Sequence, residues 1–223
     1  MTKSNVPVYN GTLRNHSIRL PHCIRECSGI RIFGMRIKSI AFTTDVAIIK
    51  NINADAVIAV YPFTPQPAIT QAIIGVSEVP VFCGVGGGLT NGVRSASMAA
   101  YVEHQGAYGV VCNSKIGVET IHAIKDAVEI PVVYTVISEN TDIQPYLTAG
   151  VDIINVSGAA RTPEIVGALR QRYPELPIIA TGGPTEESIL ATIRAGANAI
   201  TYTPPSSASL FAKTMADNRS ELE

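Results

Sequence analysis

Four side chains capable of proton transfer, nucleophilic attack or ligand binding lie at or just beyond the ends of short apolar runs. A carboxylate can exchange a proton or bind a cation, and a desolvated lysine amine can attack a carbonyl to form a Schiff base. A buried amide needs hydrogen-bond partners, which a ligand can supply. If the apolar runs are strands, these groups gather at one end of a sheet. They are Asp45, Lys115, Glu139 and Asn155.

Each of these four residues also has an alternative role without chemistry. Asp45 is placed to cap a following helix, and Asn155 to be an amide satisfied within the core. Lys115 and Glu139 can equally be solvated loop residues, since most charged side chains are exposed. The sequence leaves these alternatives open.

A second group of residues is suited to binding an anion such as phosphate. Residues 177–185 read as a buried strand followed by two glycines, which allow a sharp turn and a close approach to a ligand. A helix capped by Thr185 follows, and residues 199–207 repeat a strand and a small-residue loop. Tight strand–helix packing is the other explanation for the glycines. The predicted phosphate ligands are Thr181, Gly182, Gly183, Thr203, Ser206 and Ser207.

The elements that position these residues repeat along the chain. Three of the expected strands start behind a Glu-apolar-Pro sequence, at residues 78, 129 and 175, and the alternate strands follow Ala or Gly. Proline is tolerated at a strand start, and glycine suits the end of a helix. With helices between them, the expected strands are 39–44, 56–61, 79–84, 109–112, 131–137, 152–156, 178–181 and 199–203.

Eight parallel strands with intervening helices favour a closed (β/α)8 TIM barrel, an α/β fold, over an open doubly wound sheet. We expect an N-terminal arm over residues 1–36, packed on a single barrel domain over 37–223. The arm should hold a short helix near Cys23 and a strand over 30–33, and the last helix should span 207–215.

Composition excludes several classes of protein. The 223 residues are 46% hydrophobic, enough for one barrel, and a formal net charge of −1 argues against nucleic-acid binding. Apolar runs are too short for a signal peptide or a membrane helix, so we expect a cytoplasmic protein. The four scattered cysteines fit a reducing compartment, and we predict no metal site.

The segment 178–207, with Thr181-Gly182-Gly183 and Ala195-Gly196-Ala197, resembles the last quarter of ribulose-phosphate-binding (β/α)8 barrels. In that superfamily the loops after strands 7 and 8 hold the substrate phosphate, and keto-deoxy-phosphogluconate aldolases carry a similar Thr-Gly-Gly. The chain departs from the pattern at Pro204-Pro205, which lack two N–H donors. It also lacks the aldolases' lysine in strand 6, so their lysine role does not transfer to Lys115.

The resemblance implies an enzyme of the lyase/aldolase or isomerase/epimerase type, acting on a small phosphorylated metabolite such as a sugar phosphate. One alternative is an FMN-dependent oxidoreductase, since flavin-binding barrels share the Gly-Gly and Ala-Gly-Ala sequences. The others are a hydrolase in which Asp45 activates water and a non-catalytic phosphometabolite-binding barrel. The leading interpretation requires no cofactor. Binding of Mg²⁺ or FMN and homo-oligomer formation are left open.

Overall fold

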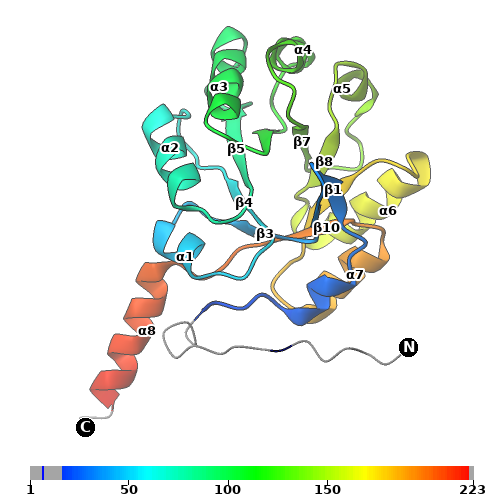
Figure 1. Cartoon of the computed structure of the whole chain (residues 1–223). Helices are drawn as coiled ribbons and strands as arrows, with labels where there is room; N and C mark the ends of the chain where they lie inside the picture. Colours follow the sequence, from blue (N-terminus) through cyan, green and yellow to red (C-terminus); the bar gives the residue numbers. More distant parts are fainter. Residues whose placement is uncertain (1–6, 8–16, 221–223) are drawn as a thin grey trace.

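Eight parallel strands close into a barrel in the computed structural model, which describes residue 7 and residues 17–220 (Figure 1). The last strand pairs with the first, with Ile200 opposite Ser39, so the closed barrel is confirmed and the open sheet is wrong. Around the ring the strands are β3 (Ser39–Phe42), β4 (Ala56–Ala59), β5 (Val81–Gly86), β6 (Gly109–Cys112), β7 (Val132–Val136), β8 (Ile153–Val156), β9 (Ile178–Thr181) and β10 (Ala199–Tyr202).

Side chains alternate between the two faces of each strand and build two apolar layers. On β4, Ile58 belongs to the cluster inside the barrel, whereas its neighbour Val57 belongs to the cluster between strands and helices. Helices pack on that outer layer through residues three or four apart, as with Ile121 and Ile124. They are α1 (Val46–Lys50), α2 (Pro67–Val76), α3 (Val93–His104), α4 (Val118–Ala127), α5 (Gln144–Thr148), α6 (Thr162–Arg172), α7 (Glu186–Arg194) and α8 (Ser207–Ser220), with 3-10 turns η2 (His22–Glu26) and η3 (Ala159–Arg161).

A hairpin closes the amino-terminal end of the barrel. Strands β1 (Ile30–Ile32) and β2 (Met35–Ile37) pair antiparallel, and their isoleucines join the interior cluster with residues that begin the barrel strands. Phe33, in the turn between them, stacks edge-on against Tyr108, with ring centroids 5.5 Å apart. The sequence predicted β1 and the helical turn near Cys23, but not β2. The predicted arm also includes residues 1–6 and 8–16, which lie outside the described residues.

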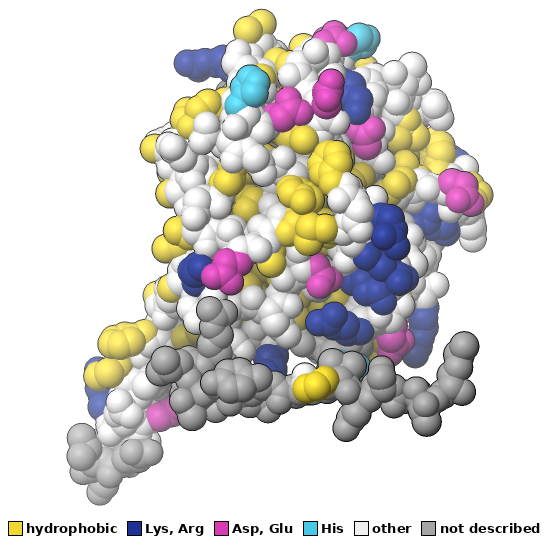
Figure 2. Space-filling model, in the orientation of Figure 1, with side chains coloured by type: hydrophobic (Ala, Val, Ile, Leu, Met, Phe, Trp, Pro, Cys, Tyr) yellow, Lys and Arg dark blue, Asp and Glu magenta, His cyan; other side chains and the backbone are white. Residues whose placement is uncertain are grey.

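Helix α8 is exposed along its length except at Met215, which is half-buried. It runs to Ser220, beyond the predicted end, and none of its residues is buried. Figure 1 shows it projecting away from the barrel, and Figure 2 shows apolar side chains along it at the lower left. Over the described part of the chain, no helix combines the length and hydrophobicity needed to cross a bilayer.

Candidate active site at the carboxyl ends of the strands

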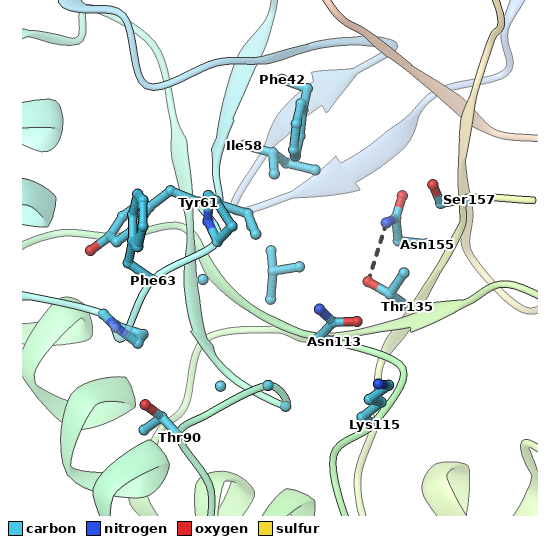
Figure 3. A pocket seen from close by; sticks show the side chains of 18 of the residues that line it. Phe42, Ile58, Tyr61, Phe63, Thr90, Asn113, Lys115, Thr135, Asn155 and Ser157 are labelled. Atoms are coloured by element: carbon cyan, nitrogen blue, oxygen red, sulfur yellow. Dashed lines mark hydrogen bonds between the residues drawn. The ribbon is translucent and has the colours of Figure 1, made fainter. Parts of the chain in front are cut away.

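A cavity of about 580 Å³ opens at the carboxyl ends of the barrel strands (Figure 3). This is the end at which (β/α)8 enzymes place their active sites. The hairpin occupies the opposite end, so ligands reach the barrel interior from this side. The cavity is lined by residues 42, 58, 60–63, 65, 84, 86–90, 111, 113, 115, 135, 137, 155, 157, 181, 201 and 203.

One wall of this cavity is apolar. Phe42 and Ile58 come from the neighbouring strands β3 and β4, and Tyr61 and Phe63 from the loop that follows β4 (Figure 3). The Tyr61 hydroxyl accepts a hydrogen bond from the backbone N–H of Gln66 at 2.9 Å, which ties this loop to the start of α2.

Across the cavity from this wall lies a polar surface, the polar floor, which is built from paired strand positions. Thr135 on β7 lies opposite Asn155 on β8, and Thr181 on β9 lies opposite Thr201 on β10. Residues paired across parallel strands point to the same face, and all four side chains point into the barrel. Asn155 itself pairs with Ile179 on β9, so Thr181 lies two residues further toward the carboxyl end of its strand. The amide nitrogen of Asn155 donates to the Thr135 hydroxyl at 3.3 Å. Together they form a floor of amide and hydroxyl groups.

Three buried oxygens of the lining make no hydrogen bond within the described chain. They are the Asn155 Oδ1 and the hydroxyls of Thr90 and Thr201, and both threonines are only 6% exposed. A buried polar group without a partner costs about 1–3 kcal/mol. A polar ligand that pairs with these atoms would recover that free energy.

Lys115, in the loop between β6 and α4, is the one charged residue among those that the structure places in the lining. Its side chain is exposed, and it stands on the polar side with Asn113, Asn155 and Ser157 (Figure 3). The cavity therefore presents one positive charge beside neutral donors and acceptors, which suits an anion.

Asp45 and Ser207 contact each other outside the lining. The Oδ1 of Asp45 accepts from the N–H groups of Ala47 and Ile48 and so caps α1, the alternative that the sequence left open. Its Oδ2 accepts from the backbone N–H of Ser207 at 2.8 Å and from its hydroxyl at 2.5 Å. These bonds, with the Ser207 hydroxyl first, lower the pKa of Asp45. Both donors of Ser207 that were predicted to bind phosphate thus face a carboxylate.

Glu139 also lies outside the cavity lining. Its carboxylate pairs with the Arg161 guanidinium, whose Nε contacts Glu164 at 3.2 Å. The hydrogen bond from Arg161 lowers the pKa of Glu139, which makes the carboxylate a weaker base. Its role as an acid or base stays a prediction.

The remaining predicted phosphate ligands are divided between the cavity and its surroundings. Thr181 and Thr203 line the cavity. Gly182 and Gly183 do not: a Cβ on Gly182 would lie 2.8 Å from the side chains of both Ile189 and Ile200. The Ser206 hydroxyl accepts from the N–H of Ser209 at 3.1 Å. Phosphate binding at this corner stays a prediction.

The sequence analysis did not select Thr90, Thr135 or Thr201, nor the apolar wall. For two of these threonines, the alternation of inward-facing and outward-facing side chains along a strand was the available signal. Thr135 and Thr201 are polar residues at inward-facing positions of strands that are otherwise almost wholly apolar. Thr90 follows a glycine-rich loop, for which no sequence pattern fixes the side-chain direction.

The lining offers amide, hydroxyl and amine groups but no carboxylate. Mg²⁺ is usually held by one or two carboxylates together with substrate oxygens. No group of three or more His, Cys, Asp or Glu residues suited to a metal occurs in the described ranges. These residues therefore do not fit a resident magnesium ion.

No protein-family model and no curated protein matches the sequence. Solved structures do. A putative phosphonomutase from Burkholderia cenocepacia J2315 is 17% identical with a TM-score of 0.63, covering 83% of this chain and 92% of its own. A phosphonopyruvate hydrolase in complex with oxalate and Mg²⁺ is 16% identical with a TM-score of 0.61, covering 82% and 80%. For 2,3-dimethylmalate lyase, a PEP mutase/isocitrate lyase superfamily member, the values are 13%, 0.64, 90% and 84%.

At these identities the similarity concerns the fold. It supports a (β/α)8 barrel and does not single out the ribulose-phosphate-binding superfamily that the segment 178–207 resembles.

Proposed function

We propose that this barrel is an enzyme of the lyase or isomerase/mutase type that acts on a small organic acid at the carboxyl ends of its strands. The observation that carries the proposal is the placement of Lys115 beside a buried polar floor whose Asn155 and Thr201 oxygens have no partner among the described residues. Two of the similar barrels reported above, a putative phosphonomutase and 2,3-dimethylmalate lyase, are named for reactions of this class, and a third is named a phosphonopyruvate hydrolase.

In this proposal the residues have distinct roles. The Lys115 ammonium binds the substrate's carboxylate or phosphate and stabilises negative charge that develops next to it, as in an enolate. Because the Asn155 amide nitrogen already donates to Thr135, its Oδ1 is left to accept, so it suits a substrate hydroxyl. The Thr201 hydroxyl can donate or accept. A small hydroxy acid matches this set of groups.

A second candidate is a non-catalytic binding barrel. The lining contains no carboxylate, histidine or cysteine. Lys115 and Tyr61 are the two lining residues of the described chain whose side chains can ionise. Binding without turnover would favour this candidate. The flavin and hydrolase alternatives stay predictions, and a yellow purified protein would favour the first.

The test measures binding and turnover with the full chain. Malate, oxalate, pyruvate, phosphoenolpyruvate and ribulose 5-phosphate are titrated by calorimetry, and each mixture is followed by carbon-13 NMR. We expect Lys115→Met to weaken binding about tenfold or more, since a hydrogen bond to a charged group contributes about 1.5–3 kcal/mol.

The matched control is Lys213→Met, which removes a lysine on the projecting helix α8 and should leave affinity unchanged. Equal affinity of wild type and Lys115→Met, or no binding of any acid at millimolar concentration, would contradict the proposed site.

A further inference from the structure

The apolar wall of the cavity is larger than a hydroxy acid of a few carbon atoms requires. Phe63 is 69% exposed and Leu89, at the tip of the loop after β5, is 87% exposed, and both line the cavity. Phe42, 39% exposed, continues this surface inward to the buried Ile58. Clustered exposed apolar side chains at a binding cavity mark a contact surface for something apolar.

The depth of this surface indicates a small molecule as its occupant. Ile58 is 2% exposed and lies inside the barrel, on the same cavity as the polar floor. A ligand in contact with Asn155 therefore extends along Ile58 and Phe42 toward the rim. Figure 3 shows Phe42, Ile58 and Phe63 across the cavity from Thr135, Asn155 and Ser157.

We propose that the substrate is amphiphilic, with its anionic group at Lys115 and an alkyl or aromatic body against Phe42, Phe63 and Leu89. This inference rests on the proposed function, because it takes Lys115 as the anion-binding residue, and it deepens that function by naming the substrate class. It disfavours sugar phosphates, whose hydroxyl groups would be desolvated against a wall without partners for them.

The test is a homologous series of fatty acids from acetate to octanoate, titrated against the full chain by calorimetry. Burying a methylene contributes about 0.8 kcal/mol, so affinity should rise up to about fourfold for each added carbon until the wall is covered. Phenylpyruvate should bind more tightly than pyruvate for the same reason.

Two variants locate the effect. Phe63→Ser should flatten the dependence of affinity on chain length, because it removes part of the apolar wall. Phe211→Ser is the matched control, because Phe211 is 68% exposed but lies on α8, and it should keep the wild-type dependence. Both side chains are largely exposed, so both variants should fold, which circular dichroism verifies.

Several results would overturn the inference. They are octanoate binding no tighter than acetate, an unchanged chain-length dependence in Phe63→Ser, and a sugar phosphate binding more tightly than octanoate. If the proposed function itself fails, no acid binds and Lys115→Met changes nothing, which is a different outcome.

Discussion

Asp45 illustrates how a single carboxylate can serve two elements that are distant in sequence. It caps α1 through Oδ1 and holds the first residue of α8 through Oδ2. Both helix amino termini carry partial positive charge, which a carboxylate stabilises. The sequence identified the capping role as one of two alternatives. It offered no signal for Ser207 as a partner, because that residue lies 162 positions away.

Replacing Asp45 with alanine should lower the free energy of unfolding by about 1–2 kcal/mol at neutral pH, the usual cost of losing a helix cap. The pKa of Asp45 is lower in the folded chain than its unfolded value of about 3.9. Its contribution is therefore complete above that pH and is lost as the pH falls through the folded pKa. Urea titrations of wild type and Asp45→Ala should converge below about pH 4.

Asp126 supplies the control, since it is an exposed carboxylate on α4 whose Oδ2 lies 3.2 Å from the Nδ1 of His122. Asp126→Ala should change stability by less than about 0.5 kcal/mol. A difference between Asp45→Ala and wild type that stays constant from neutral to acid pH would show that its ionisation contributes nothing.

At the scale of elements, Gly182 after β9 can serve either tight packing or ligand binding, and a substitution distinguishes the two. An added methyl group at Gly182 would meet the buried side chains of Ile189 on α7 and Ile200 on β10. Overpacking of this kind typically costs 1–3 kcal/mol, so Gly182→Ala should lower the unfolding free energy by about that amount.

Gly167, inside α6, is the matched glycine, because a Cβ there meets no atom within 4 Å. Gly167→Ala should stabilise the chain by about 0.5–1 kcal/mol, since alanine loses less backbone entropy in a helix. If both variants unfold at the same denaturant concentration as wild type, packing does not explain Gly182, and ligand contact becomes the better explanation.

The strands and helices of the barrel could be predicted because their signals are local. Apolar runs, proline at strand starts and glycine after helices placed every barrel strand within a few residues. Strand β2 was not predicted because it is three residues long with two exposed positions, and three residues are too few to show an alternating pattern. The end of α8 was not predicted because a helix with no buried residue has no apolar face that marks its length.

The cavity depends on contacts that are not local. Lys115, Asn155, Thr181 and Thr203 line it, and each was selected as a residue at the end of a strand. Glu139 stands equally close to a strand end, yet it pairs with Arg161, 22 residues further on. Which polar residue faces the cavity and which one pairs elsewhere depends on tertiary neighbours, and one sequence does not specify these.

For the whole molecule, the two barrel ends have different tasks. The hairpin of β1 and β2 fills the amino-terminal end with isoleucines that belong to the interior apolar cluster. The carboxyl end keeps a cavity whose polar oxygens have no partner in the described chain, at a cost in stability. Ligand binding should therefore raise the melting temperature of the whole barrel by mass action.

Helix α8 leaves the barrel without burying any residue, which predicts that the barrel folds without it. A chain that ends after Ser209 keeps Ser207 and its bonds to Asp45, and its unfolding free energy should stay within about 0.5 kcal/mol of wild type. A chain that ends at Pro205 loses those bonds and should be about 1–3 kcal/mol less stable, because bonds to charged groups contribute that much. Urea unfolding of the three chains measures both differences. A loss of several kcal/mol on removing residues 210–223 would contradict the independence of the barrel from α8.

The same deletion tests whether α8 mediates self-association, because it removes the exposed Leu210 and Phe211. If self-association depends on α8, the chain ending at Ser209 should sediment as a smaller species than wild type in sedimentation velocity.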